Sequence, residues 1–162
     1  GEGAFAMLWV SPLSPRAYLA ARVVTVGLLS LMQTLLLVLL VYDAPMWRLA
    51  LAGGLFSAAG LSALFGFVVI AWFDDLYAFL LPMIGAIMAL SAPGYGVLLG
   101  IDPLWFVWHP TAGPLALIEI AFNLDATQSL AMAIASTAAW LAAAGVLAYA
   151  AIVRMRARIG GV

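Results

Sequence analysis

The feature that most constrains this chain is the run from Val23 to Val41, which contains no charged residue. A helix needs about 20 mostly apolar residues to cross a bilayer, so this run is long enough to span one. The rest of the chain has the same character: 67% of its 162 residues are hydrophobic and 8% are charged. Soluble domains are about 45–50% apolar and about 25% charged. The sequence therefore predicts an all-α integral membrane protein.

Further apolar segments predict a single transmembrane domain, residues 1–162, with four membrane helices. The third helix is interrupted by Pro82 and by the sequence from Ser91 to Gly96. Residues 101–125 are apolar but broken by charges and prolines. We expect them to form an external re-entrant or interfacial hairpin, in which Pro114–Phe122 is a short helix. The four predicted spans are residues 15–41, 49–73, 76–100 and 126–153.

Three polar residues mark expected helix starts. Ser14 precedes Pro15, which is the favoured order of an N-cap and a first helical residue. Asp74 is the expected cap of the third span. Asp125, with Gln128 three residues later, resembles a capping box for the last span.

Arginine placement predicts the orientation in the membrane. Five arginines fall on one side of the four predicted spans, and only Arg48 falls on the other. We expect this chain in the plasma membrane. Because cytoplasmic loops carry the excess of basic residues, we expect both of its termini on the cytoplasmic side. Residues 154–162 would then be a basic cytoplasmic tail. The five arginines are Arg16, Arg22, Arg154, Arg156 and Arg158.

Signatures of enzymes and of cofactor sites are missing from the sequence. It has neither a Gly-x-Ser-x-Gly elbow nor a glycine-rich phosphate loop. The chain has no cysteine, which excludes thiolate metal sites, and we predict no metal site. The single histidine, His109, is expected to form hydrogen bonds within a loop. No bound cofactor, no catalytic residue and no nucleic-acid partner are expected of this chain.

Small and weakly polar residues recur along the predicted spans. On the second span they repeat every fourth residue, which lets helix backbones approach closely. Packing within the chain, a dimer interface and the wall of a weakly polar pathway all suit such a pattern. Gln33 lies near mid-membrane and needs a partner there, in another helix or in a substrate. Glu119 is either a carboxylate that reaches water or one that faces a gate or substrate. The small and weakly polar residues are Ser30, Thr34, Gly54, Ala58, Ser62, Gly66 and Ser136.

The segment Gly1–Val24 resembles the one that precedes the third span in permeases of the type-2 ABC exporter superfamily. The order of the later spans also matches. His109–Phe122 is loosely similar to the external segment of the drug-exporting branch, including fluoroquinolone export permeases. Unlike most members, the chain carries no charge from Gly3 to Val10. The resemblance implies the C-terminal part of a six-span permease, without its first two spans. Within Gly1–Val24, the residues that match the pattern of this family are Glu2, Ser11, Pro12, Leu13, Ser14, Tyr18, Leu19 and Arg22.

This resemblance implies that residues 1–14 form a cytoplasmic coupling helix that contacts an ATP-binding cassette ATPase subunit. ATP and Mg would be bound by that ATPase, and the membrane partner would be a second copy or a homologous permease. The substrate is expected to be hydrophobic or amphipathic, because the spans offer almost no charge. The alternative is a scaffold subunit of a membrane complex without transport of its own. The expected coupling residues are Glu2, Phe5, Leu8, Ser11, Pro12, Ser14 and Arg16.

Overall fold

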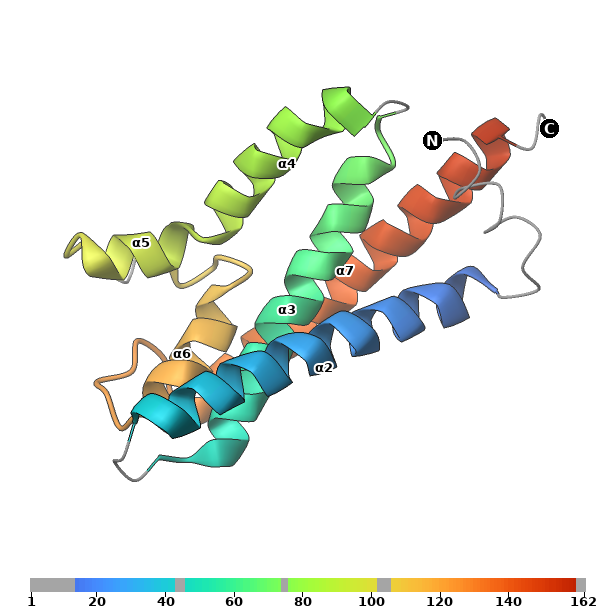
Figure 1. Cartoon of the computed structure of the whole chain (residues 1–162). Coiled ribbons are helices and arrows are strands. Elements are labelled where there is room, and N and C mark those ends of the chain that lie inside the picture. The colour runs from blue at the N-terminus through green and yellow to red at the C-terminus, as the bar shows by residue number, and fades with distance from the viewer. Residues whose placement is uncertain (1–13, 43–45, 74–75, 102–105, 160–162) are drawn as a thin grey trace.

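The computed structural model describes residues 14–42, 46–73, 76–101 and 106–159, and these contain six α-helices and no strand (Figure 1). Three helices are long and apolar enough to cross a membrane, namely α2, α3 and α7. Two shorter ones, α4 and α5, follow each other directly and are bent by 51°. The helices are α2 Pro15–Val41, α3 Arg48–Ile70, α4 Leu76–Leu90, α5 Ala92–Leu98, α6 Ala112–Ala121 and α7 Leu130–Ile159.

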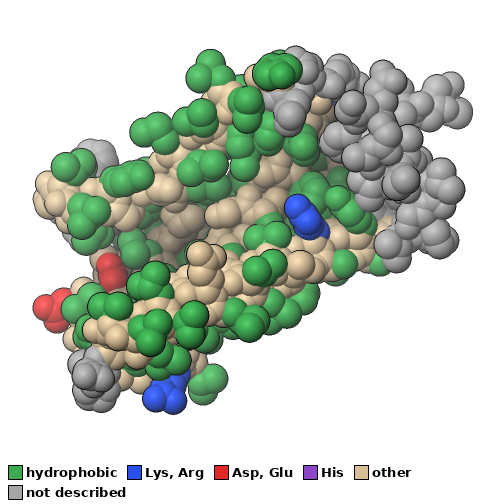
Figure 2. Space-filling view, viewed as in Figure 1, with side chains coloured by type: hydrophobic (Ala, Val, Ile, Leu, Met, Phe, Trp, Pro, Cys, Tyr) green, Lys and Arg blue, Asp and Glu red, His purple; other side chains and the backbone are tan. Residues whose placement is uncertain are grey.

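The all-helical class is confirmed, and these apolar helices are consistent with a membrane protein. In Figure 2, hydrophobic side chains are spread over the visible surface and few charged ones appear. The third expected span, 76–100, is not one straight helix. It is the bent pair α4–α5, so the described residues contain three candidate spans, or four where that pair counts as one.

The chain breaks after Leu90 and not at Pro82, which lies inside α4. The cause is Pro93, in the first turn of α5. Proline has no backbone N–H, so it cannot bond to the carbonyl of Ala89 four residues earlier. The interruption expected from Ser91 to Gly96 is therefore confirmed.

Two predicted boundaries of the last span are wrong. The final helix begins at Leu130 and not at 126, and it continues through Ile159, so the expected tail from 154 starts as helix. Ser129 caps it, since its Oγ accepts a hydrogen bond from the N–H of Met132 at 3.4 Å. The predicted capping box of Asp125 is therefore wrong, because the helix starts four residues later. The side chain of Gln128 bonds instead to Val107 and Ser136.

The other predicted caps have different outcomes. Ser14 is the N-cap of α2, and its Oγ accepts a hydrogen bond from the N–H of Ala17 at 3.2 Å. This confirms the predicted start at Pro15. The second long helix begins at Arg48 and ends at Ile70, three residues before the expected end at 73. The predicted cap Asp74 lies outside the described residues.

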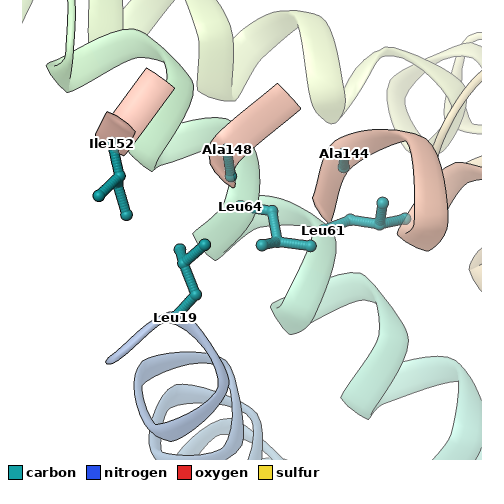
Figure 3. Close-up of a cluster of buried hydrophobic side chains, with 6 residues drawn as sticks. All are labelled: Leu19, Leu61, Leu64, Ala144, Ala148 and Ile152. Carbon is teal, nitrogen blue, oxygen red and sulfur yellow. The ribbon is translucent and has the colours of Figure 1, made fainter. Parts of the chain in front are cut away.

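Helices α2 and α7 both pack against α3, and α2 runs antiparallel to the other two (Figure 1). Small residues allow close packing at one end, where alanines of α7 face leucines of α3 and α2 (Figure 3). Nearer the middle, a Cβ on Gly27 would lie 2.6 Å from the ring of Phe56. The cluster at that end consists of Leu19, Leu61, Leu64, Ala144, Ala148 and Ile152.

The described arginines follow the predicted partition between the two ends of the bundle. The first turns of α2 and the last turns of α7 lie at the same end (Figure 1), and they carry Arg22 and Arg154. The guanidinium of Arg154 lies 5.0 Å from the ring centroid of Trp72, which follows α3. Arg48 begins α3 at the opposite end.

The short helix α6 is wedged between α3 and α7 at that opposite end. It confirms the helix expected within Pro114–Phe122, although the surrounding helices bury most of it. Two glycines allow the contact. A Cβ on Gly54 of α3 would lie 2.8 Å from the carbonyl oxygen of Pro114, and one on Gly113 of α6 would lie 2.8 Å from that of Ala133 in α7. Backbone therefore packs on backbone across all three helices.

Candidate functional site

A cleft with a volume of about 630 Å³ lies between the bent pair α4–α5 and the pair α3 and α6. Figure 2 shows the surface hollowed in this region. Aliphatic and aromatic side chains make up most of the lining. By element, the lining residues are Ala58, Ser62, Phe65 and Gly66 of α3; Met83, Ala86, Ile87 and Leu90 of α4; Ser91, Gly94, Tyr95 and Leu98 at α5; and Thr111, Pro114, Leu115 and Ile118 at α6.

The cleft exists because α3 presents small side chains toward larger ones on α4. Ala58, Ser62 and Gly66 leave space that leucines at the same positions would fill. The two helices are in contact near Gly66, where an added Cβ would lie 3.6 Å from the Cε of Met83. After Leu90 the chain bends by 51°, and this bend brings α5 into contact with α6.

Two side chains from the loop before α6 lie at the bend. The hydroxyl of Thr111 donates a hydrogen bond of 2.8 Å to the carbonyl of Leu90. His109 lies beside the carbonyl of Ala89, the one that Pro93 cannot reach, and this carbonyl raises the pKa of the imidazole. The loop thereby satisfies the backbone carbonyl of Leu90, which is exposed where α4 ends.

His109 also contacts Thr111 directly, with its Nδ1 3.0 Å from the Thr111 Oγ1 and 3.3 Å from the Thr111 backbone nitrogen. Partial burial lowers the pKa of His109, and the hydrogen bond to Ala89 opposes that shift. The prediction that this histidine forms hydrogen bonds within a loop is confirmed.

Hydroxyl groups are the main side-chain polar groups in the cleft. Ser62 donates its proton to the carbonyl of Ala58 at 2.9 Å, as Thr111 does to Leu90, so each offers a ligand only acceptor lone pairs. Ser91 and Tyr95 complete the set, and none of the described residues that line the cleft has a charged side chain. Across the described residues, no three His, Cys, Asp or Glu side chains are grouped to hold a metal ion. Such a cleft can bind an apolar molecule, or the hydrocarbon part of an amphipathic one.

The structure brings some of the predicted pathway residues together and separates others. Ala58, Ser62 and Gly66 line the cleft, whereas Gly54 of the same stripe packs on α6. Ser30 and Thr34 are half-buried on α2, outside the cleft, and Gln33 is exposed. Ser136 lies at the contact of α7 with α6, where its Oγ donates to Gln128 and Ala133.

Most of the predicted coupling residues lie outside the described residues: Glu2, Phe5, Leu8, Ser11 and Pro12. Ser14 caps α2. Arg16 lies in the first turn of α2, and the structure does not describe its side chain.

Glu119 has a different environment from either one expected. Its side chain is 8% exposed, so it does not reach water from a helix surface. It does not line the cleft either. One carboxylate oxygen accepts a hydrogen bond of 2.9 Å from the N–H of Thr127, and the backbone carbonyl accepts one from Leu124 at 3.0 Å. Glu119 therefore closes the loop between α6 and α7.

Replacing Glu119 with alanine is expected to lower the free energy of unfolding by about 2 kcal/mol, because the partly buried N–H of Thr127 loses its acceptor. Glu119→Gln keeps an oxygen at this position and should cost less than half as much. Unfolding of the purified chain in mixed micelles, followed by circular dichroism, measures both. Equal losses in the two variants would contradict the role of the acceptor.

Sequence reasoning missed Thr111, Tyr95 and the position of Gln128. The buried amide of Gln128 donates to the carbonyl of Val107 at 3.2 Å and accepts from Ser136 at 3.2 Å, which joins the loop before α6 to α7. In the sequence, Pro93 indicates that the carbonyl of Ala89, four residues earlier, lacks a helical N–H partner. Nothing in the sequence indicates which side chain satisfies it.

Comparisons with protein-family models, curated proteins and solved structures found no match to this chain.

Proposed function

We propose that this chain is the C-terminal part of a permease subunit of an ATP-driven exporter of the type-2 ABC kind. Its cargo is a hydrophobic or amphipathic molecule, drug-like or lipid-like. The observation that carries the proposal is the cleft of about 630 Å³, which is lined by small residues of α3 and by the bent pair α4–α5. Its volume and apolar lining suit a ligand of drug size, and a hydrocarbon chain from the bilayer has the same chemistry.

The order of the helices supports the same proposal. Two long apolar helices are followed by a bent pair, a short apolar helix and a third long helix. The resemblance to type-2 exporter permeases implies three spans, then external helices, then a last span. The bend after Leu90 gives the cleft one wall made of two helices set at 51° to each other.

In this proposal the chain performs no hydrolysis itself. A separate ATPase subunit binds ATP and Mg, contacts residues 1–14, and pushes on the start of α2. Both ends of the described chain face the cytoplasm at the plasma membrane, in accord with the arginines at the start of α2 and the end of α7. A second copy or a homologous permease completes the pathway. Such coupling requires that ATP have different affinities for the two states of the transporter.

A scaffold subunit without transport is the second candidate. The backbone contacts of Gly54 and Gly113 favour it, because they make the α3–α6–α7 unit a tightly packed block. In that case the cleft holds a resident lipid chain and nothing moves through it.

Inside-out membrane vesicles that contain the chain and its co-purifying ATPase separate these candidates. The probes are a phospholipid with a fluorescent acyl chain and a hydrophobic cationic dye. An exporter should move at least one probe when ATP is added, and should not do so when the ATPase carries an inactivating substitution in its phosphate loop. Absence of an associated ATPase, or ATP hydrolysis without movement of either probe, would favour the scaffold.

A further inference from the structure

The side of α2 that faces away from α3 carries an amide in the middle of an apolar surface. Gln33 is exposed, and its amide makes no hydrogen bond within the described part of the chain. It lies four residues from the centre of the span Ala17–Val41, or about 6 Å along the axis. An amide at this depth faces hydrocarbon, where an unsatisfied polar group is costly.

The residues around Gln33 form a continuous apolar seam. Leu29, Leu36 and Leu40 are 64%, 63% and 77% exposed, and they share one face with Gln33 at spacings of four, three and four residues. This is the heptad spacing of a helix seam that packs against another helix, with one polar residue at a core position. The opposite face, which includes Gly27, packs against α3, where a Cβ added to Gly27 would lie 2.6 Å from the ring of Phe56.

We propose that this seam is the contact between two copies of the chain, and that the two Gln33 amides form reciprocal hydrogen bonds across a two-fold axis. The amide is self-complementary, since it has both a carbonyl acceptor and N–H donors. A two-fold interface places the same residue on both sides. Two copies inserted in the same orientation present Gln33 at equal depth, so each satisfies the other. A single amide within a leucine seam also fixes the register of the two helices.

This inference deepens the proposed exporter by naming the contact between its two membrane domains. Only the role of the dimer in export rests on the proposed function. The observations that support the dimer itself all concern α2. Dimer formation and export can therefore fail separately.

The absence of cysteine makes a clean cross-linking test available. Leu40→Cys lies on the seam. Leu39→Cys is its matched control, because Leu39 is 54% exposed at nearly the same depth and lies about 100° around the helix. In native membranes, oxidation should convert Leu40→Cys to a disulfide-linked dimer at least about five times faster than Leu39→Cys.

The amide is tested in the Leu40→Cys chain. Gln33→Leu should weaken dimerisation about tenfold, the effect of losing one or two interhelical hydrogen bonds in a membrane, and Gln33→Asn should retain most of it. Leucine is favourable in lipid, so the variant should insert normally. Equal cross-linking at 39 and 40 would overturn the proposed interface and leave lipid or another chain as the partner of Gln33. Unchanged dimerisation in Gln33→Leu would overturn the role of the amide. Probe transport in vesicles is scored separately and reports on the exporter alone.

Discussion

Gly113→Ala is expected to lower the free energy of unfolding by about 2–3 kcal/mol, a large stability loss for the addition of one methyl group. The new Cβ would lie 2.5 Å from the Oγ1 of Thr137 and 2.8 Å from the carbonyl oxygen of Ala133, and it would also overlap the Oγ of Ser136. The two hydroxyls can rotate, but the carbonyl belongs to the backbone of α7. Helix α6 must therefore move away from α7.

The matched control is Gly145→Ala, also at a helical position but with nothing within 4 Å of an added Cβ. Alanine favours helix over glycine, so this change should leave stability equal or slightly higher. Unfolding in mixed micelles compares the two variants. Equal stability of Gly113→Ala and the unmodified chain would show that α6 does not need backbone contact with α7.

A second large effect is expected in the cleft, where Ser62→Phe should weaken binding of dansyl-undecanoate about tenfold. Ser62 is exposed within the lining of the cleft, so the new ring can occupy the space without displacing the core. Loss of about 60 Å² of apolar ligand burial costs about 1.5 kcal/mol, which is a tenfold change in affinity. Fluorescence of the dansyl group, which rises in an apolar site, measures binding to the chain in nanodiscs.

Two variants control this measurement. Ser62→Ala removes the hydroxyl without filling the cleft and should bind the probe nearly as well as the unmodified chain. Ala143→Phe adds the same ring at an exposed position of α7 that does not line the cleft. If Ser62→Phe and Ala143→Phe bind the probe equally well, the probe does not occupy this cleft.

The small residues of α3 show what a local sequence pattern predicts and what it leaves open. The sequence predicts that Gly54, Ala58, Ser62 and Gly66 form one small-residue stripe, because they recur every four residues. The stripe serves two purposes: Gly54 lets α6 approach, while the other three leave the cleft open. The spacing defines a shared face, but it does not say whether a neighbouring helix or empty space lies opposite. Gly113, which has no such spacing, is close to α7 only because of the fold.

Short-range signals determined the membrane class, the three long apolar helices, the cap at Ser14 and the interruption near Pro93. Each depends on residues that are close in sequence. The membrane class and the long helices follow from the length of the apolar runs, the cap from the side-chain oxygen of Ser14, and the interruption from the N–H that Pro93 lacks. The tertiary structure alone decided that Thr111 binds the carbonyl of Leu90 at the bend, and that Glu119 binds the N–H of Thr127. It also decided that Gln33 faces away from the bundle. A polar group in an apolar chain must find a partner, but which partner it finds depends on how separate helices are oriented about their axes, and no local pattern encodes that rotation.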